Sequence, residues 1–166
     1  MIVLGIDPGT ATTGYGLIGK NNSSLQVIDF GVIETSPKEE SHYRLRRIHE
    51  RLKDLIKEFS PTDMAVEQLF FNTNTTTAIT VGQARGIALL AAASFGISLG
   101  EYTPLQVKQA VTGYGGARKN QVQQMVKTVL GLAEIPRPDD AADALAIAIC
   151  HINSTGLLNK IKAMGD

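Results

Sequence analysis

The sequence predicts an α/β fold in which a mixed sheet of five strands carries helices on both faces. Three extended segments come first, and helical and extended patterns then alternate along the rest of the chain. This order is typical of a mixed sheet covered on both sides. At 166 residues the chain is most simply one domain with a sizeable core.

The first part of the chain supplies three strands and one helix. Residues 2–7 form an apolar run typical of a buried strand, and residues 12–19 and 25–35 alternate as two further strands around a turn at 21–24. A helix from Ser41 to Phe59 is predicted because apolar residues recur along one face. Those residues are Leu45, Ile48, Leu52, Leu55, Ile56 and Phe59.

The second part of the chain alternates helices and strands. A short strand at 64–67 is apolar on both sides, as central strands are. A long helix over 72–96 has an Asn/Thr-rich start that suits an N-cap and a second half packed with Ala and Gly. The remaining elements are a strand at 97–102 and helices at 104–112, 119–131 and 139–153.

Composition favours a cytoplasmic protein. Hydrophobic residues make up 43% and charged residues 19%, and the single Cys150 excludes an internal disulfide and fits a reducing compartment. We expect no signal peptide, because no basic region precedes the first apolar run and Asp7 lies where cleavage would remove it. The longest apolar stretch, 86–99, is too short to span a bilayer.

Four acidic residues in three separated stretches predict one metal-binding cluster. Asp7 and Glu67 each end an apolar strand, while Asp140 and Asp143 share one face at the start of the last helix. A carboxylate beside apolar surface is costly unless it is paired, and Lys and Arg are scarce nearby in the sequence, so divalent cations are the expected partners. Oxygen ligands suit Mg²⁺, and two such ions can activate a water and stabilise the leaving oxygen in a phosphodiester displacement.

Each of these carboxylates also has a purely structural interpretation. Asp7-Pro8-Gly9 is common turn chemistry, and Glu67 could be a strand-end residue in solvent. Asp139 or Asp140 could simply cap the last helix, but a cap does not explain Asp143. We therefore favour metal ligation.

Two groups of residues suggest a nucleic-acid partner. The net charge of zero argues mildly against one, but metals on the four carboxylates would leave basic residues in excess. Arg85, Lys108, Arg118 and Lys119 are expected to hold phosphates, although a solvated basic face is the default for any one of them. Of Phe70 and Phe71, one is expected in the core and the other as a wedge between bases, with a hydrophobic staple as the alternative.

Six motifs, in order along the chain, resemble the RuvC family of crossover junction endodeoxyribonucleases over roughly residues 1–153. They are Gly5-Ile6-Asp7-Pro8-Gly9, Gly14-Tyr15-Gly16, Val66-Glu67-Gln68, Gly82-Gln83-Ala84-Arg85-Gly86, Gln106-Val107-Lys108 and the run from Asp140 to Ala146. The resemblance implies an RNase H-like nuclease domain, placed at 1–155, and leaves a C-terminal tail, 156–166, with an open role.

The resemblance also implies an activity and partners. It implies a homodimer that cleaves Holliday junctions with two Mg²⁺ ions per active site, replaceable by Mn²⁺, in bacterial recombination and repair. The residues implied to bind the metals are Asp7, Glu67, Asp140 and Asp143. Lys108 and Lys119 would serve DNA binding or catalysis, Phe70 would insert into the junction, and the helix containing 82–93 would form the dimer interface. A branch-migration motor complex is the implied protein partner.

Three alternatives remain open from the sequence alone. One is an RNase H-like nuclease acting on ribosomal RNA precursors, which shares the Asp turn of the first strand. Another is a small-molecule kinase or ATPase on the same ancestral fold, although 166 residues leave no room for a second subdomain. The last is a non-catalytic junction binder, which would gain nothing from an acidic cluster facing phosphates.

Overall fold

The computed structural model describes residues 1–22, 24–68 and 75–165, excluding the side chains of 75–77 and 157–165. Its centre is a five-stranded sheet in the order β3-β2-β1-β4-β5. The strands are β1 (Ile2–Asp7), β2 (Thr12–Asn21), β3 (Ser24–Glu34), β4 (Asp63–Glu67) and β5 (Ser98–Tyr102). Strands β1, β2 and β3 pair antiparallel, whereas β4 and β5 run parallel to β1. The predicted mixed sheet is confirmed.

The parallel pairing of β1 with β4 determines where two of the candidate carboxylates lie. Ile6 lies opposite Val66 in this pairing. Asp7 and Glu67 follow by one residue and are the last residues of their strands. Because the carboxyl ends of parallel strands meet at one edge of a sheet, both side chains leave the sheet on adjacent strands at the same edge.

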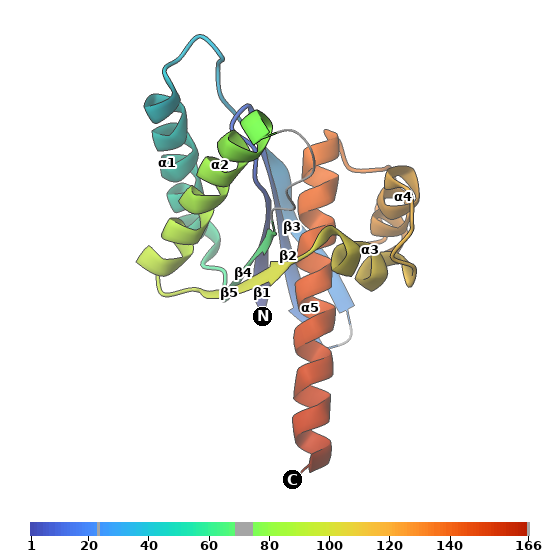
Figure 1. Ribbon diagram of the computed structural model, residues 1–166. Helices are drawn as coiled ribbons and strands as arrows, with labels where there is room; N and C mark the ends of the chain where they lie inside the picture. Colours follow the sequence, from blue (N-terminus) through green and yellow to red (C-terminus); the bar gives the residue numbers. More distant parts are fainter. Residues whose placement is uncertain (23, 69–74, 166) are drawn as a thin grey trace.

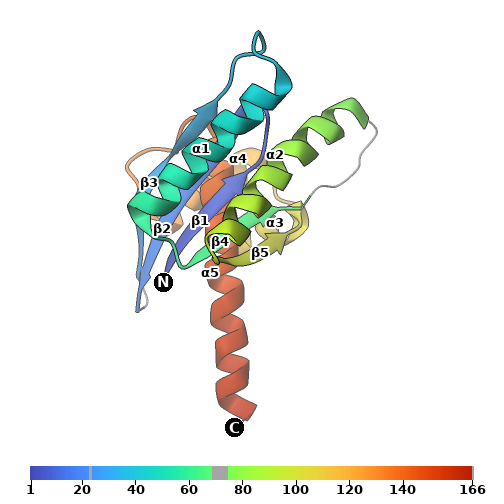
Figure 2. The ribbon, with the colours of Figure 1, turned by 90° about the vertical axis from the view of Figure 1, so that its left-hand side faces the viewer.

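Helices cover both faces of the sheet, as predicted. Figure 1 shows α1 (Ser41–Phe59) and α2 (Thr75–Ser94) on one side, and α3 (Pro104–Thr112), α4 (Lys119–Val129) and α5 (Asp139–Gly165) on the other. The view from the side shows that α1 and α2 lie next to each other on the same face of the sheet (Figure 2). Each face of the sheet has its own apolar core, and neighbouring β1 residues point to opposite faces. Val3 belongs to the core beneath α5, and Leu4 belongs to the core beneath α1 and α2.

Helix α5 packs directly on the backbone of β1 and β2. A Cβ atom at Gly5 would lie 2.1 Å from the carbonyl oxygen of Ala144, and one at Gly14 would lie 2.0 Å from that of Asp140. Both distances are far below any ordinary carbon–oxygen contact, so only glycine allows the helix this close. This approach holds the first turn of α5, with Asp140 and Asp143, beside the edge where β1 ends.

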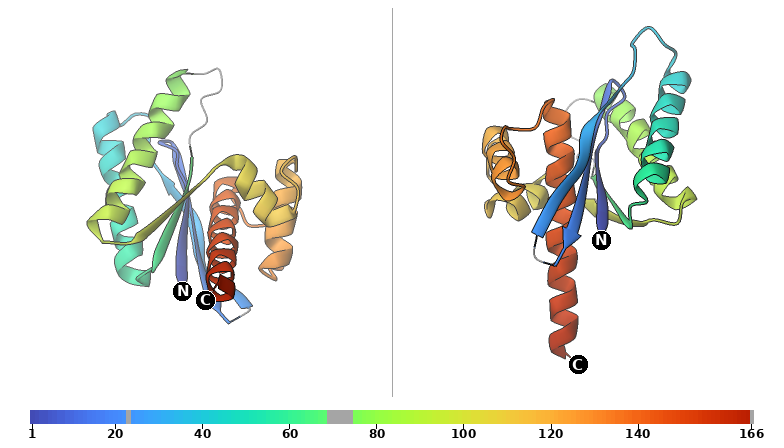
Figure 3. Two further views of the ribbon diagram at one scale, coloured as in Figure 1. Left: turned by 60° about the horizontal axis from the view of Figure 1, so that its bottom comes forward. Right: turned by 180° about the vertical axis from the view of Figure 1, so that it is seen from behind.

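The element boundaries agree with the prediction to within about three residues, except at the end of the chain. Residues 2–7, 41–59 and 104–112 form elements with the predicted limits. The last helix, expected to end near Asn153, continues to Gly165 and projects beyond the sheet (Figure 3). Gly156 is an isolated helix-weakening residue that costs only about 1 kcal/mol, and no proline follows it. The division of the chain at residue 155 stays a prediction.

Among the described helices, none combines the length and the apolar character that a bilayer crossing requires.

Gly5→Ala should destabilise the protein by about 3 kcal/mol, because the new methyl group overlaps the backbone of α5. Gly19→Ala in β2 is the control, since its Cβ would meet Ile28 only at 3.4 Å, an ordinary contact. Urea unfolding of both variants measures the effect. Equal stability of the two variants would show that α5 does not rest on the β1 backbone.

Candidate active site

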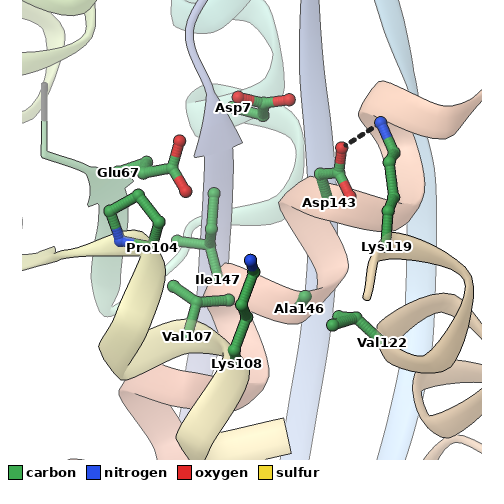
Figure 4. A pocket seen from close by; sticks show the side chains of 10 residues that line it. All are labelled: Asp7, Glu67, Pro104, Val107, Lys108, Lys119, Val122, Asp143, Ala146 and Ile147. Carbon is green, nitrogen blue, oxygen red and sulfur yellow. Dashed lines mark ion pairs between the residues drawn. The ribbon is translucent and has the colours of Figure 1, made fainter. Parts of the chain in front are cut away.

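The candidate active site is a cavity between the carboxyl ends of β1 and β4 and the helices α3, α4 and α5. Figure 4 shows Asp7, Glu67 and Asp143 around this space, with Lys119 beside Asp143 and Lys108 projecting from α3. The cavity measures about 270 Å³. Its remaining walls are apolar and come from Pro104, Val107, Val122, Ala146 and Ile147.

Asp7 is the most strongly perturbed carboxylate of the group. Its pKa is raised from 3.8 to about 7, first by burial and then by the negative charges of Glu67, Asp143 and Asp140, while Lys119 acts in the opposite direction. Asp140 is not part of the cavity wall, yet its charge acts on Asp7. The four carboxylates expected to form one cluster therefore interact through Asp7.

Glu67 and Asp143 are affected by the same two causes. Burial raises the pKa of both side chains, and the charge of Asp143 raises that of Glu67. Two lysines oppose these effects: Lys108 and Lys119 lower the pKa of Glu67, and a hydrogen bond from Lys119 lowers that of Asp143. The site thus holds more negative charge than its own lysines neutralise.

Lys119 is the main cation of the site. Its Nζ lies 2.8 Å from Oδ2 of Asp143 and 3.6 Å from Oδ2 of Asp139. The expectation that basic residues are scarce near the carboxylates was wrong. It counted only neighbours in the sequence, whereas Lys108 and Lys119 lie close to the carboxylates in the folded protein. Asp139 is the first residue of α5, not its cap, and it pairs with Lys119 and Arg137.

The donor chemistry of the site fits a divalent cation. All the acidic donors are carboxylate oxygens, which Mg²⁺ and Mn²⁺ prefer, and partly buried carboxylates that repel one another are stabilised by a shared cation. Among the described residues, however, no three His, Cys, Asp or Glu side chains are gathered into a ready metal-binding group. A shared ion therefore requires these carboxylates to turn toward each other, and Asp143 to loosen its pairing with Lys119.

The residues expected to bind DNA differ in their surroundings. Lys108 and Lys119 line the cavity. Arg118 is exposed at the start of α4, where its main-chain N–H donates to Oε1 of Gln121 at 2.8 Å. Arg85 contacts protein groups, pairing with Glu101 and donating to the main-chain oxygen of Glu67. Phe70 and Phe71 lie outside the described residues.

The sequence did not indicate the contacts of Arg85 or the apolar cavity wall. Arg85 and Glu101 lie on different elements, and no spacing rule connects them. The wall combines Val107 of α3 with Val122 of α4 and Ile147 of α5, each readable only as a core residue of its own helix.

Asp7→Asn should stabilise the protein at neutral pH in the absence of metal. Because the folded-state pKa of about 7 lies above 3.8, Asp7 contributes full stability only below pH 3.8, and this contribution is lost as the pH rises through about 7. At about 1.4 kcal/mol per unit, the loss is at most about 4 kcal/mol. Urea unfolding in EDTA should show the advantage of the variant growing from pH 5 to pH 8.

The control for this experiment is Asp54→Asn, on the exposed surface of α1. Its unfolding free energy should follow the wild-type protein at both pH values. An advantage of Asp7→Asn that does not change with pH would contradict the raised pKa of Asp7.

Comparison with known proteins identifies the family. A family model described as crossover junction endodeoxyribonuclease RuvC matches residues 3–151. A protein of that name from Desulfitobacterium hafniense is 58% identical over 97% of this chain and 98% of its own length. The corresponding protein of Caldanaerobacter subterraneus is 52% identical over 97% of this chain and 98% of its own length.

Solved structures agree with these relatives. RuvC of T. thermophilus in complex with a Holliday junction substrate is 41% identical, with a TM-score of 0.89 over 93% of this chain and 94% of that one. The yeast mitochondrial resolvase Ydc2, 14% identical, has the same fold, with a TM-score of 0.73 over 98% of this chain and 82% of that one. These matches confirm the RNase H-like fold and set aside the RNA-nuclease, kinase and binder alternatives. The chain belongs to the RuvC family of crossover junction endodeoxyribonucleases.

Proposed function

We propose that this chain resolves Holliday junctions by metal-dependent nicking of two opposed DNA strands, in homologous recombination and repair, leaving 5′-phosphate and 3′-hydroxyl ends. The proposal rests chiefly on the position of Asp7, which is partly buried near three further carboxylates and faces a cavity that two lysines also line. This arrangement attracts divalent cations and, once they are bound, phosphate oxygens.

In this proposal Asp7, Glu67, Asp140 and Asp143 hold two Mg²⁺ ions, and Mn²⁺ can replace them. When bound, these ions supply an activated water and stabilisation of the leaving 3′ oxygen. Asp7 must lose its proton to serve as a ligand, which its pKa of about 7 allows near neutral pH.

The lysines and the apolar wall have separate tasks in the reaction. Lys108 and Lys119 would contact the DNA phosphates, and Lys119 would give up its ion pair with Asp143 where that carboxylate holds a metal. Val107 and Ile147 form part of the cavity wall and limit the water that reaches the reacting phosphate. Arg118 extends the basic surface at the start of α4. Phe70 and Phe71 are proposed to act at the junction's point of strand exchange.

We also propose that the active form is a homodimer joined through α2. Ile79 is 64% exposed and Leu90 is 52% exposed, and with Gly86 between them they lie on one face of the helix. An exposed apolar stripe around a small residue suits close packing against a second copy. Two-fold symmetry places two active sites on the two equivalent strands of a junction. The proposal also places the protein in the cytoplasm and gives it a branch-migration motor complex as its protein partner.

Asp7→Asn should reduce junction cleavage by more than about 100-fold, because a metal ligand is lost. Its affinity for the junction should stay equal or increase, because a negative charge near the phosphates is removed. Cleavage of a labelled four-way junction with Mg²⁺, beside a linear duplex and an EDTA sample, measures the first effect. A gel-shift titration in Ca²⁺ measures the second.

Asp54→Asn is again the matched control and should cleave like the wild-type protein, with paired symmetric nicks in the junction alone. Loss of junction binding in a folded Asp7→Asn protein would contradict the mechanism. Cleavage of the linear duplex as fast as the junction would contradict the proposed substrate.

A further inference from the structure

Arg85 joins three elements of the fold beneath the candidate active site. It lies on α2, on the face of the sheet opposite to α3, α4 and α5 (Figure 1). Its Nε donates to the main-chain oxygen of Glu67 at 3.2 Å, and its Nη2 pairs with a carboxylate oxygen of Glu101. The guanidinium therefore bridges the end of β4 to the neighbouring strand β5.

Arg85 binds the main-chain oxygen of Glu67 and not its carboxylate, so it can act on the backbone that carries the side chain. Glu67 is the last residue of β4, and the main-chain N–H of the next residue, Gln68, donates to the oxygen of Tyr102 at 2.8 Å. Tyr102 ends β5. Glu67 is the last β4 residue paired with β5, opposite Tyr102, so the bond from Arg85 adds a side-chain restraint to the main chain at the point where this pairing ends.

The chemistry of the guanidinium suits a positioning task. It is planar and donates in fixed directions, so it can hold a carbonyl and a carboxylate at the same time, whereas an ammonium is a point charge. The Arg85 side chain is only 21% exposed and Glu101 is 38% exposed, so the pair is shielded in part from solvent. These two contacts, together with the low exposure of the side chain, direct the guanidinium toward protein groups.

We propose that Arg85 is a positioning residue, which, held by Glu101, fixes the main chain at Glu67 so that the Glu67 carboxylate faces the cavity. The inference rests on the proposed role of Glu67 as a metal ligand. It replaces the expectation that Arg85 contacts DNA. Arg85 acts through the backbone from one face of the sheet, while Lys108 and Lys119 act on the carboxylate from the other.

Four variants of the full-length chain test the proposal: Arg85→Gln, Arg85→Lys, Glu101→Gln and the double variant of Arg85→Gln with Glu101→Gln. Four quantities are measured for each: junction affinity in Ca²⁺, the single-turnover cleavage rate at saturating protein in Mg²⁺, Mn²⁺ affinity by calorimetry, and the unfolding midpoint in urea. Arg46→Ala is the matched control, since Arg46 forms an ion pair with Glu50 on α1. Arg118→Ala serves as the example of a DNA contact.

Arg85→Gln should lower the cleavage rate and the Mn²⁺ affinity by about 10- to 100-fold each, as loss of a group that orients a metal ligand does. Junction affinity should stay within about twofold of the wild-type value, whereas Arg118→Ala should weaken junction binding. Arg85→Lys should recover part of both losses, and Glu101→Gln should cause a smaller loss of the same kind. The double variant should be no worse than Arg85→Gln, because the two residues act as one unit.

Two outcomes in the Arg85 variants would overturn this inference without contradicting the proposed function. Weaker junction binding with an unchanged rate at saturation would make Arg85 a DNA contact. A lower unfolding midpoint with unchanged rate and Mn²⁺ affinity would make it a structural residue only. Failure of the proposed function would be seen in other proteins of the set: the wild-type protein would be inactive, or a Glu67→Gln variant would cleave and bind Mn²⁺ normally. Either result would also overturn the inference about Arg85.

Discussion

The approach of helix α5 to the backbone of β1 and β2 is the constraint on which the site depends. Gly5 and Gly14 leave no side chain between the strands and the helix, so the carbonyl groups of Ala144 and Asp140 lie where a Cβ atom would otherwise be. This contact places a helix start carrying Asp140 and Asp143 beside the strand end carrying Asp7. Residues more than 130 positions apart in the sequence are thereby brought into one electrostatic group.

This arrangement places several carboxylates close together, and their repulsion destabilises the metal-free protein. Burial and mutual repulsion disfavour the charged forms of Asp7, Glu67 and Asp143, and Lys119 relieves only part of this through its 2.8 Å contact with Asp143. A metal ion can relieve the rest, so the same repulsion that destabilises the metal-free protein favours metal binding. Under the proposed function, stability and function are therefore opposed at Asp7.

The sequence predicted the parts of this account that depend on local pattern. Asp7 and Glu67 were found because each ends an apolar strand, and Asp143 because a helix cap does not explain it. The pairing of Lys119 with Asp143 and the bridge from Arg85 to Glu101 could not be predicted, because each joins distant elements whose approach is set by packing. The expected end of α5 near Asn153 was wrong: the helix continues to Gly165, because Gly156 weakens a helix without ending it.

The most direct test of the central claim is the number of protons released when Mn²⁺ binds the protein. Calorimetric titrations at pH 7 in two buffers of different ionisation enthalpy give this number. If cations bind the carboxylates around Asp7, whose pKa is about 7, binding at pH 7 should release about half a proton from Asp7 alone, and the Asp7→Asn variant should lose this release. The same release in the variant would contradict the account by placing the metal away from Asp7, and tight binding without proton release would contradict the raised pKa of Asp7.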